Sequence, residues 1–314
     1  MVVICVKPLY IGLVNFLVES TQLIDLNYRG RFAPSPTGPL HFGSLVAAVG
    51  SYLDAKYHHG KWLVRIEDVD SQREVPGAAS GILYMLERLG MEWDEEVVYQ
   101  SQRSEAYFEA LNILCKQGLI YPCTCSRKEI SDSSIMGLNG RIYPGTCLKN
   151  PASVKKIHAL RIQTNNDLIQ FKDILNGTFS QRLKTDVGDF VLRRADGIYA
   201  YQLAVVVDDA AQHITHVVRG ADLLESTPRQ IFLQRLLDYP IPQYLHLPVV
   251  MDAKGEKLSK QTNAMPVNSL DTLTQLVDAL HFLGQKPPVE ILEGDVVSFW
   301  QWAQQNWRVN LIAH

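Results

Sequence analysis

Two periods of hydrophobic and polar positions alternate along this chain. Short apolar or alternating runs predict strands, and apolar positions spaced three and four residues apart predict helices. The expected strands span 28–33, 61–66, 159–163, 169–173, 178–183, 189–194 and 214–219. The expected helices begin at 43 and at 227 and span 81–89, 104–117, 269–283 and 296–307. Strands and helices that follow one another in this way predict an α/β fold.

One stretch, 199–209, fits both periods. Its three valines favour a strand, whereas Tyr201, Val205 and Asp208 fall on one face of a helix. The residues alone leave this choice open.

Local signals add detail near the C-terminal end. Thr227 followed by Pro228 predicts a helix start at which the threonine is the cap. Trp300, Trp302 and Trp307 belong to the last expected helix and are most simply packing residues of a helical cap.

A proline-rich loop separates the first strand from the first helix. Three prolines and a glycine between 34 and 39 exclude both helix and continuous sheet. A strand, a rigid loop and a helix N-terminus in this order form an anion site, because free backbone N–H groups and the positive end of the helix dipole face the loop. His41 and Gly43 lie at its mouth, where the histidine can donate to a phosphate oxygen. The alternative is a crossover loop without a ligand.

A second candidate phosphate site is the sequence KLSKQ at 257–261. Lys257 and Lys260 beside Ser259 form a cationic clamp for a phosphate chain, and the alternative is a solvated basic loop.

Carboxylates follow the 61–66 strand directly, at Glu67, Asp68 and Asp70. Ligands of an open α/β sheet bind at the carboxyl ends of its strands. Arg65 and Glu67 share a face of the strand, and the Glu67 carboxylate is a natural partner for an ammonium group. The alternative is an acidic cluster at a helix N-terminus.

Three of the five cysteines gather in a segment with little periodicity. Cys123, Cys125 and Cys147 are one ligand short of a tetrahedral zinc site. Residues 131–140 between them are expected to form a loop, and Cys115 is expected in the core beside a helical stripe. An odd number of cysteines in a long chain argues against a disulfide framework.

Composition places few limits on function. Hydrophobic residues make up 46% and charged residues 20%, which is typical of a globular protein, and the net charge is −3. A contact with RNA therefore requires a local basic patch. The candidate residues are Lys149, Lys155, Lys156, Lys172, Arg182 and Lys184.

No apolar run in the chain reaches the length of a membrane span. The apolar run at 9–18 faintly resembles a signal peptide but contains Asn15 and lacks a following cleavage site, so we expect residues 1–27 to be a disordered extension or a start-site artefact. A cytoplasmic protein is expected.

The motifs resemble those of a known family. The sequence LHFGS (40–44) resembles the histidine–glycine motif of class I aminoacyl-tRNA synthetases, and KLSKQ resembles their lysine–serine–lysine motif. The longer sequence RFAPSPTGPLHFGSL (31–45) is specific to the glutamyl branch of this class. The match continues through RIEDVD, VVVDD and RGADLLESTPRQ and covers roughly 28–265. The resemblance implies a Rossmann-type catalytic domain with a zinc-containing insertion and a short helical C-terminal region, and it favours a helix at 199–209.

This organisation divides the chain into five parts. The expected parts are the extension 1–27, the first catalytic half 28–118, the insertion 119–187, the second catalytic half 188–265 and the helical region 266–314.

The resemblance also implies a reaction and its residues. ATP, with Mg²⁺, activates L-glutamate to glutamyl-adenylate, and the glutamate is then transferred to RNA. The implied catalytic residues are His41, Lys257 and Lys260, and the implied ATP-binding residues are His41, Gly43, Lys257, Ser259 and Lys260. The implied glutamate-binding residues are Arg31, Phe32, Ala33, Pro34, Ser35, Glu67, Tyr201 and Arg219. The implied zinc ligands are Cys123, Cys125, Tyr143 and Cys147.

The number of residues after Met265 limits which RNA the resemblance implies as the substrate. About fifty residues remain, which is less than an anticodon-binding domain. The chain therefore resembles a shortened branch of the glutamyl enzymes that attaches glutamate to the queuosine base at the wobble position of tRNA(Asp), and a monomer is expected. Two alternatives stay open: charging of the 3′ end of tRNA(Glu) with a separate anticodon-binding subunit, and a non-catalytic RNA-binding paralogue.

Overall fold

The computed structural model describes residues 28–137, 140–150, 158–251, 266–267 and 270–313. The expectations for the 1–27 extension and for Lys257, Ser259 and Lys260 of the KLSKQ sequence fall outside these residues, as do those for Lys155 and Lys156. Within the described parts, no helix is both long and apolar enough to cross a membrane.

Parallel strands form the centre of the molecule. β1 (Arg29–Phe32) pairs in parallel with β2 (Lys61–Ile66), and β2 pairs with β3 (Val98–Tyr99). β11 (His216–Gly220) pairs in parallel with β12 (Gln243–Leu247). The backbone N–H of Thr215 donates to the carbonyl of Arg29 at 3.0 Å, which places the start of β11 beside β1. The strands that carry the sequence motifs are therefore neighbours.

A hairpin extends the β11–β12 sheet. β8 (Leu168–Asp173) and β9 (Gly177–Arg182) are antiparallel, and Asp173 of β8 pairs with Tyr244 of β12. This hairpin belongs by sequence to the expected insertion 119–187, yet it joins the strands of the second catalytic half. The division into five parts stays a prediction.

A separate sheet lies at one end of the molecule. β7 (Ala159–Ile162) pairs antiparallel with both β4 (Ile120–Cys123) and β10 (Phe190–Arg193). The remaining elements of this region are α4 (Arg127–Ser133), β5 (Ile135–Gly137), β6 (Gly140–Ile142), α5 (Thr146–Lys149) and α6 (Leu183–Asp186).

The expectation of a loop at 131–140 is wrong. The segment contains the end of α4 and most of the β5–β6 hairpin. Ser126 and Glu129 form a capping box that starts α4, and a seven-residue helix is too short to show a helical period.

The helices of the catalytic part lie largely where their apolar stripes predict. α1 (Phe42–Tyr57) connects β1 to β2, and α7 (Tyr201–Ala211) confirms the helix at 199–209. The other helices here are α2 (Ala78–Arg88), η1 (Gln100–Gln102), α3 (Ser104–Lys116), η2 (Ala221–Ser226) and α8 (Thr227–Leu237).

Two residue-level expectations about these helices are wrong. Cys115 is exposed, because it follows the buried Leu114 around the surface of α3. Thr227 is not a helix cap, because η2 runs directly into α8 and Thr227 already has helical backbone angles. Its hydroxyl accepts a hydrogen bond from Arg219 instead.

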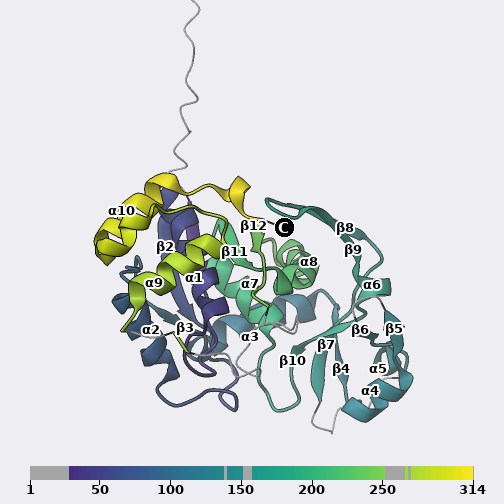
Figure 1. Cartoon of the computed structure of the whole chain (residues 1–314). Helices are drawn as coiled ribbons and strands as arrows, with labels where there is room; N and C mark the ends of the chain where they lie inside the picture. The colour runs from purple at the N-terminus through teal and green to yellow at the C-terminus, as the bar shows by residue number, and fades with distance from the viewer. Residues whose placement is uncertain (1–27, 138–139, 151–157, 252–265, 268–269, 314) are drawn as a thin grey trace, which may run out of the picture.

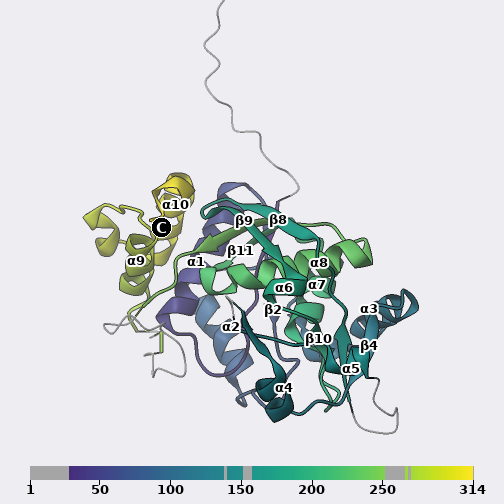
Figure 2. The same cartoon turned by 90° about the vertical axis from the view of Figure 1, so that its right-hand side faces the viewer.

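The C-terminal elements cover the opposite end. They are α9 (Thr272–Phe282), η4 (Val289–Glu293), α10 (Val296–Asn306) and η5 (Val309–Leu311). In Figures 1 and 2, α9 and α10 lie on the far side of α1 from β4, α4 and α5. The indole N–H of Trp300 donates to the carbonyl of Leu89 at 2.8 Å, and that of Trp307 to Asp54 Oδ1 at 3.0 Å. These two tryptophans are buried packing residues, as expected.

Candidate active site

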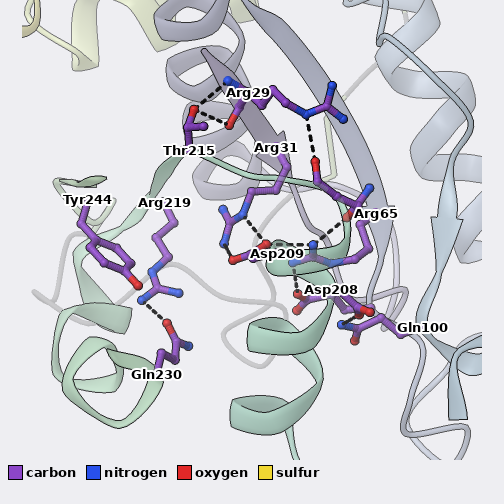
Figure 3. A network of polar contacts seen from close by, with 12 residues as sticks. Arg29, Arg31, Arg65, Gln100, Asp208, Asp209, Thr215, Arg219, Gln230 and Tyr244 are labelled. Atoms are coloured by element: carbon purple, nitrogen blue, oxygen red, sulfur yellow. Dashed lines mark hydrogen bonds and ion pairs between the residues drawn. The ribbon is translucent and has the colours of Figure 1, made fainter. Parts of the chain in front are cut away.

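Asp209 on α7 connects the arginines of two central strands (Figure 3). Its carboxylate accepts from Arg31 of β1, with Nε at 3.1 Å from Oδ1 and Nη2 at 3.3 Å from Oδ2. Arg65 Nη1 of β2 lies 2.8 Å from Oδ1. Burial raises the pKa of Asp209, but the charges of Arg31 and Arg65 outweigh it and lower the pKa below its usual range. The carboxylate therefore stays ionised and fixes both guanidinium groups.

The preceding residue, Asp208, attaches the same helix to the other side of the fold. Gln100 and Tyr107 each donate to Asp208 Oδ2 at 2.7 Å, and Arg103 donates to Oδ1. The two consecutive aspartates of α7 thus have different partners. Asp208 holds the helix to α3, and Asp209 holds the arginines of the sheet.

Arg219 ends β11 and is surrounded by hydrogen-bond acceptors. Its Nη2 donates to Thr227 Oγ1 at 2.9 Å and to Gln230 Oε1 at 2.8 Å, and its Nη1 donates to the Tyr201 hydroxyl at 3.3 Å. Its Nε lies 3.1 Å from His246 Nε2. The guanidinium carries five N–H groups, so it can keep these partners and still donate from Nη1 to a ligand.

His246 is a buried residue of β12 that the sequence analysis missed. Its Nδ1 lies 2.6 Å from Asp173 Oδ2, so Nδ1 carries the proton and Nε2 accepts from Arg219. Burial lowers the pKa of His246, and the Arg219 charge acts in the same direction. Asp173 and neutral His246 thus orient Arg219. No local sequence signal identifies this pair, because the two residues lie 73 positions apart.

Glu67 follows β2 directly and is largely buried next to Arg65, with Oε1 at 3.5 Å from Arg65 Nη2. Burial raises the pKa of Glu67 to about 6, although the charges of Arg65 and Arg31 oppose the rise. The alternative of a helix N-terminus is wrong here, since α2 begins only at Ala78. The charges of Arg219, Glu67 and Arg31 all act on the Tyr201 hydroxyl, so the structure brings these four residues together.

The proline-rich loop packs against the same strand end. The backbone N–H of Glu67 donates to the Pro34 carbonyl at 2.9 Å, and Phe32 before it is buried. Ala33 and Pro34 are half-buried, whereas Ser35 is exposed. A small pocket of ≈ 40 Å³ lies between Ser35 and Glu67 and their neighbours.

His41 lies between the proline-rich loop and α1, where it is the N-cap of the helix. Its Nδ1 accepts from the Ser44 backbone N–H at 3.3 Å. Gly43 lies in the first turn of the helix. The chain returns to this point at Pro266, which forms a β-bridge with His41. Pro266, which follows the KLSKQ sequence along the chain, therefore lies beside His41.

The three clustered cysteines come together at the end of β4. The sulfur atoms of Cys123, Cys125 and Cys147 all lie within 4.8 Å of one another, so they can hold a metal ion. The Tyr143 hydroxyl lies 3.4 Å from both Cys123 Sγ and Cys125 Sγ. Burial raises the pKa of Cys147, but hydrogen bonds from Tyr143, the Thr124 backbone and Cys125 outweigh it and lower the pKa to about 6.

Comparison with known proteins identifies the family. Residues 27–282 match the model of tRNA synthetases class I (E and Q), catalytic domain. The chain belongs to this family. The motif residues of the sequence and the parallel strands that carry them are therefore those of a class I synthetase catalytic domain, and the chain is a ligase of the aminoacyl-tRNA synthetase type.

Individual relatives of this synthetase are similar over most of their length. A protein of Dechloromonas aromatica named "Glutamyl-Q tRNA(Asp) synthetase" is 56% identical over 91% of this chain and 95% of its own length. A protein of Chromobacterium violaceum with the same name is 51% identical over the same shares. Among solved structures, a glutamate tRNA ligase from Elizabethkingia meningosepticum in complex with its amino acid superposes with a TM-score of 0.72 at 26% identity. That match covers 91% of this chain but only 66% of the ligase chain.

Proposed function

We propose that this synthetase activates L-glutamate with ATP and transfers it to the queuosine base at the wobble position of tRNA(Asp). The observation that carries this proposal is the 56% identity to a relative of that printed name over 95% of the relative's length. The ligase from Elizabethkingia meningosepticum is longer, since the match covers 66% of its chain. The chain thus matches the short relatives almost end to end.

The arginines and Glu67 would bind the amino acid. Arg31 and Arg219 supply positive charge for carboxylates, and Nη1 of each is the atom that can donate to one, because Nε and Nη2 already contact protein groups. Glu67 holds the ammonium group, Tyr201 lines the site, and Phe32, Ala33, Pro34 and Ser35 form the loop wall. This assignment is supported by the hydrogen bond from Arg219 to the Tyr201 hydroxyl and by the charges of Arg219, Glu67 and Arg31 that act on this hydroxyl. Asp209 and His246 hold the two arginines in place before the substrate arrives.

The nucleotide would bind between His41 and the motif lysines. The first step is in-line attack of the glutamate α-carboxylate on the α-phosphorus of ATP, and it requires positioning and stabilisation of charge on phosphate oxygens. His41, the α1 N-terminus at Gly43, Lys257, Ser259 and Lys260 supply donors and positive charge, with Mg²⁺ as a counter-ion. This assignment is supported by the return of the chain to His41 at Pro266.

Cys123, Cys125, Cys147 and the Tyr143 oxygen would hold one structural zinc ion. Three sulfur atoms and one oxygen gathered within contact distance suit its tetrahedral coordination. The backbone N–H of Cys147 also donates to the Tyr143 oxygen at 3.0 Å, which suits an anionic phenolate ligand. When bound, the ion stabilises the insertion and takes no part in the reaction.

Glutamate-dependent exchange between ATP and pyrophosphate tests the activation step. We expect the purified protein to catalyse exchange with L-glutamate in the absence of RNA, and not with L-glutamine. Lys260→Ala is expected to reduce the exchange rate by about 10²–10³-fold, the usual loss for one donor to transition-state charge. Absence of exchange would instead support a non-catalytic RNA-binding protein.

A further inference from the structure

A second cavity is lined in part by Arg229 of α8. It has a volume of ≈ 280 Å³ and opens between the insertion and the catalytic part. Its walls come from β7, β9, α6, β10, η2 and α8, several of which lie together in Figure 2. None of the residues placed in the glutamate, nucleotide or metal sites lines it except Tyr143.

Two arginines in this cavity each keep an unused donor. Among the residues that the structure covers, the Nε atoms of Arg161 and Arg229 are buried and have no hydrogen-bond partner. Arg161 is 8% exposed, and its other contacts fix it: Nη1 donates to the Asp189 carbonyl at 2.7 Å, and the guanidinium lies 4.0 Å from the centre of the Tyr143 ring. A buried donor without an acceptor is costly, so such groups require an explanation.

The carboxylates of the cavity are already engaged by other groups. Asp189 Oδ1 accepts from the Thr164 backbone and hydroxyl, and its Oδ2 accepts from the Tyr121 hydroxyl at 2.7 Å. Asp186 accepts from the Arg182 backbone and from Thr185. Glu225 is a third carboxylate of the cavity wall, and the guanidinium N–H donors of the wall come from Arg141, Arg161 and Arg229.

Arg229 also connects this cavity with the glutamate site. The next residue on α8, Gln230, accepts from Arg219, and the Tyr201 hydroxyl acts electrostatically on Arg229. Burial lowers the pKa of Arg229, and the charge of nearby Glu225 opposes this effect only in part.

We propose that this cavity binds a phosphodiester group of the RNA strand that carries the accepting nucleoside, with Arg229 and Arg161 as the donors. This inference rests on the proposed function, because it requires an RNA that reaches the glutamate site. A phosphate oxygen is a strong acceptor for an arginine N–H group, and the Nε groups of Arg161 and Arg229 have no acceptor among the described residues. Arg229 in the first turn of α8 lines the cavity, and the next residue, Gln230, accepts from Arg219, so an RNA strand held there would lie close to the proposed glutamate site.

Salt-dependent RNA binding of Arg229→Gln tests the proposal. The probe is queuosine-containing tRNA(Asp), or tRNA(Glu) if the wild-type protein labels only that RNA with glutamate. We expect the Kd to rise about tenfold or more, the usual effect of losing one charged hydrogen bond. The slope of log Kd against log salt is expected to fall by about 0.7, the value for one phosphate contact on a single strand. Arg229→Lys, which keeps the charge, should retain the wild-type slope.

The matched control is Arg235→Gln on the exposed face of the same helix, which should leave both Kd and slope unchanged. Three results would overturn the proposal: a wild-type Kd for Arg229→Gln, a weaker Kd with an unchanged slope, or a parallel loss of RNA-free ATP–pyrophosphate exchange. A weaker Kd with an unchanged slope indicates a contact with a base. A parallel loss of ATP–pyrophosphate exchange indicates an effect on the glutamate site. Failure of the proposed function is separate, since it appears as wild-type protein that labels neither RNA.

Discussion

At the scale of single residues, the proposed glutamate site depends on side chains that do not touch the substrate. Arg31 is fixed by Asp209 of α7, and Arg219 is fixed by His246, which is itself fixed by Asp173. Preorganised charges of this kind stabilise a ligand without reorganisation when it binds. We therefore expect the carboxylates behind the arginines, Asp209 and Asp173, to affect glutamate binding.

Asp173→Asn is expected to weaken glutamate binding while the protein stays folded. An amide N–H that faces His246 Nδ1 moves the imidazole proton to Nε2, where it meets a second donor, the Nε–H of Arg219. We expect the KM for glutamate to rise about tenfold, the loss of one charged hydrogen bond, with little change in kcat. Steady-state exchange kinetics measure both constants.

Asp167→Asn serves as the control for that experiment, because Asp167 is exposed and precedes the same strand. A wild-type KM for Asp173→Asn, or a loss confined to kcat, would contradict the orienting role of His246.

Glutamate binding is also expected to depend on pH through Glu67. Burial raises its pKa from 4.5 to about 6, so the carboxylate is ionised above this value and becomes neutral as the pH falls through it. A neutral carboxyl cannot pair with the ammonium group. We expect the KM for glutamate to rise by up to about tenfold per pH unit below that pKa, and Glu67→Gln to remove this step. The KM for ATP over pH 5 to 8 is the control, and a flat glutamate profile for the wild-type protein would disprove the role of Glu67.

The residues of the motifs were predictable, and their partners were not. Arg31, Glu67 and Arg219 belong to recognisable sequence motifs, Tyr201 lies four residues before one of them, and the charges of the other three act on its hydroxyl. Asp209 lies 178 positions from Arg31, and no period or local motif encodes that contact. Pairing of this kind is set by strand order and helix packing, which the sequence does not display directly.

At the scale of elements, the length of a helix or strand decides how well its position could be predicted from the sequence. The strand 61–66 and the long helices α3 and α10 lie within a few residues of their expected positions, because several turns or alternations show a clear period. The elements α4, β5 and β6 are too short to show one and were taken for a loop. The capping box at Ser126 was the only local signal for α4 that the sequence contained.

The insertion is expected to depend on metal for its stability. Its cluster of Cys123, Tyr143 and Cys147 is small, with partly buried neighbours, so metal binding can supply a large share of its folding free energy, on the order of 10 kcal/mol of apparent binding free energy. Cys125→Ser should reduce the zinc content from about one equivalent to well below it and lower the midpoint of thermal unfolding.

Cys115→Ser provides the matched control, because Cys115 is exposed on α3 and lies outside the cluster. Elemental analysis and thermal unfolding of both variants are the measurements. A full equivalent of zinc retained by Cys125→Ser would rule out the proposed ligand set.

At the scale of the whole molecule, Asp54 of α1 connects the two ends of the described chain. Tyr28, which precedes β1, donates to its Oδ2 at 2.6 Å, and Trp307 after α10 donates to its Oδ1 at 3.0 Å. The C-terminal helices thus complete the core around α1. The sequence indicated packing tryptophans here but not the buried carboxylate that Trp307 binds.

Trp307→Phe is expected to destabilise the protein by about 1–3 kcal/mol, because one oxygen of buried Asp54 loses its donor. Urea unfolding measures the change in the free energy of unfolding. Trp302→Phe is the control, since Trp302 is only half-buried. Equal stability of the Trp307→Phe and wild-type proteins would show that the C-terminal helices contribute little through this bond.

Transfer of labelled glutamate to purified RNA tests the proposed function of the molecule most directly. The RNAs are tRNA(Asp) with queuosine, the same tRNA(Asp) without this modification, and tRNA(Glu). We predict labelling of the queuosine-containing tRNA(Asp) alone, and the label should not require an intact 3′ end. Labelling of tRNA(Glu) that is abolished by periodate treatment of its 3′ end would contradict the proposal and identify the chain as a charging enzyme for tRNA(Glu).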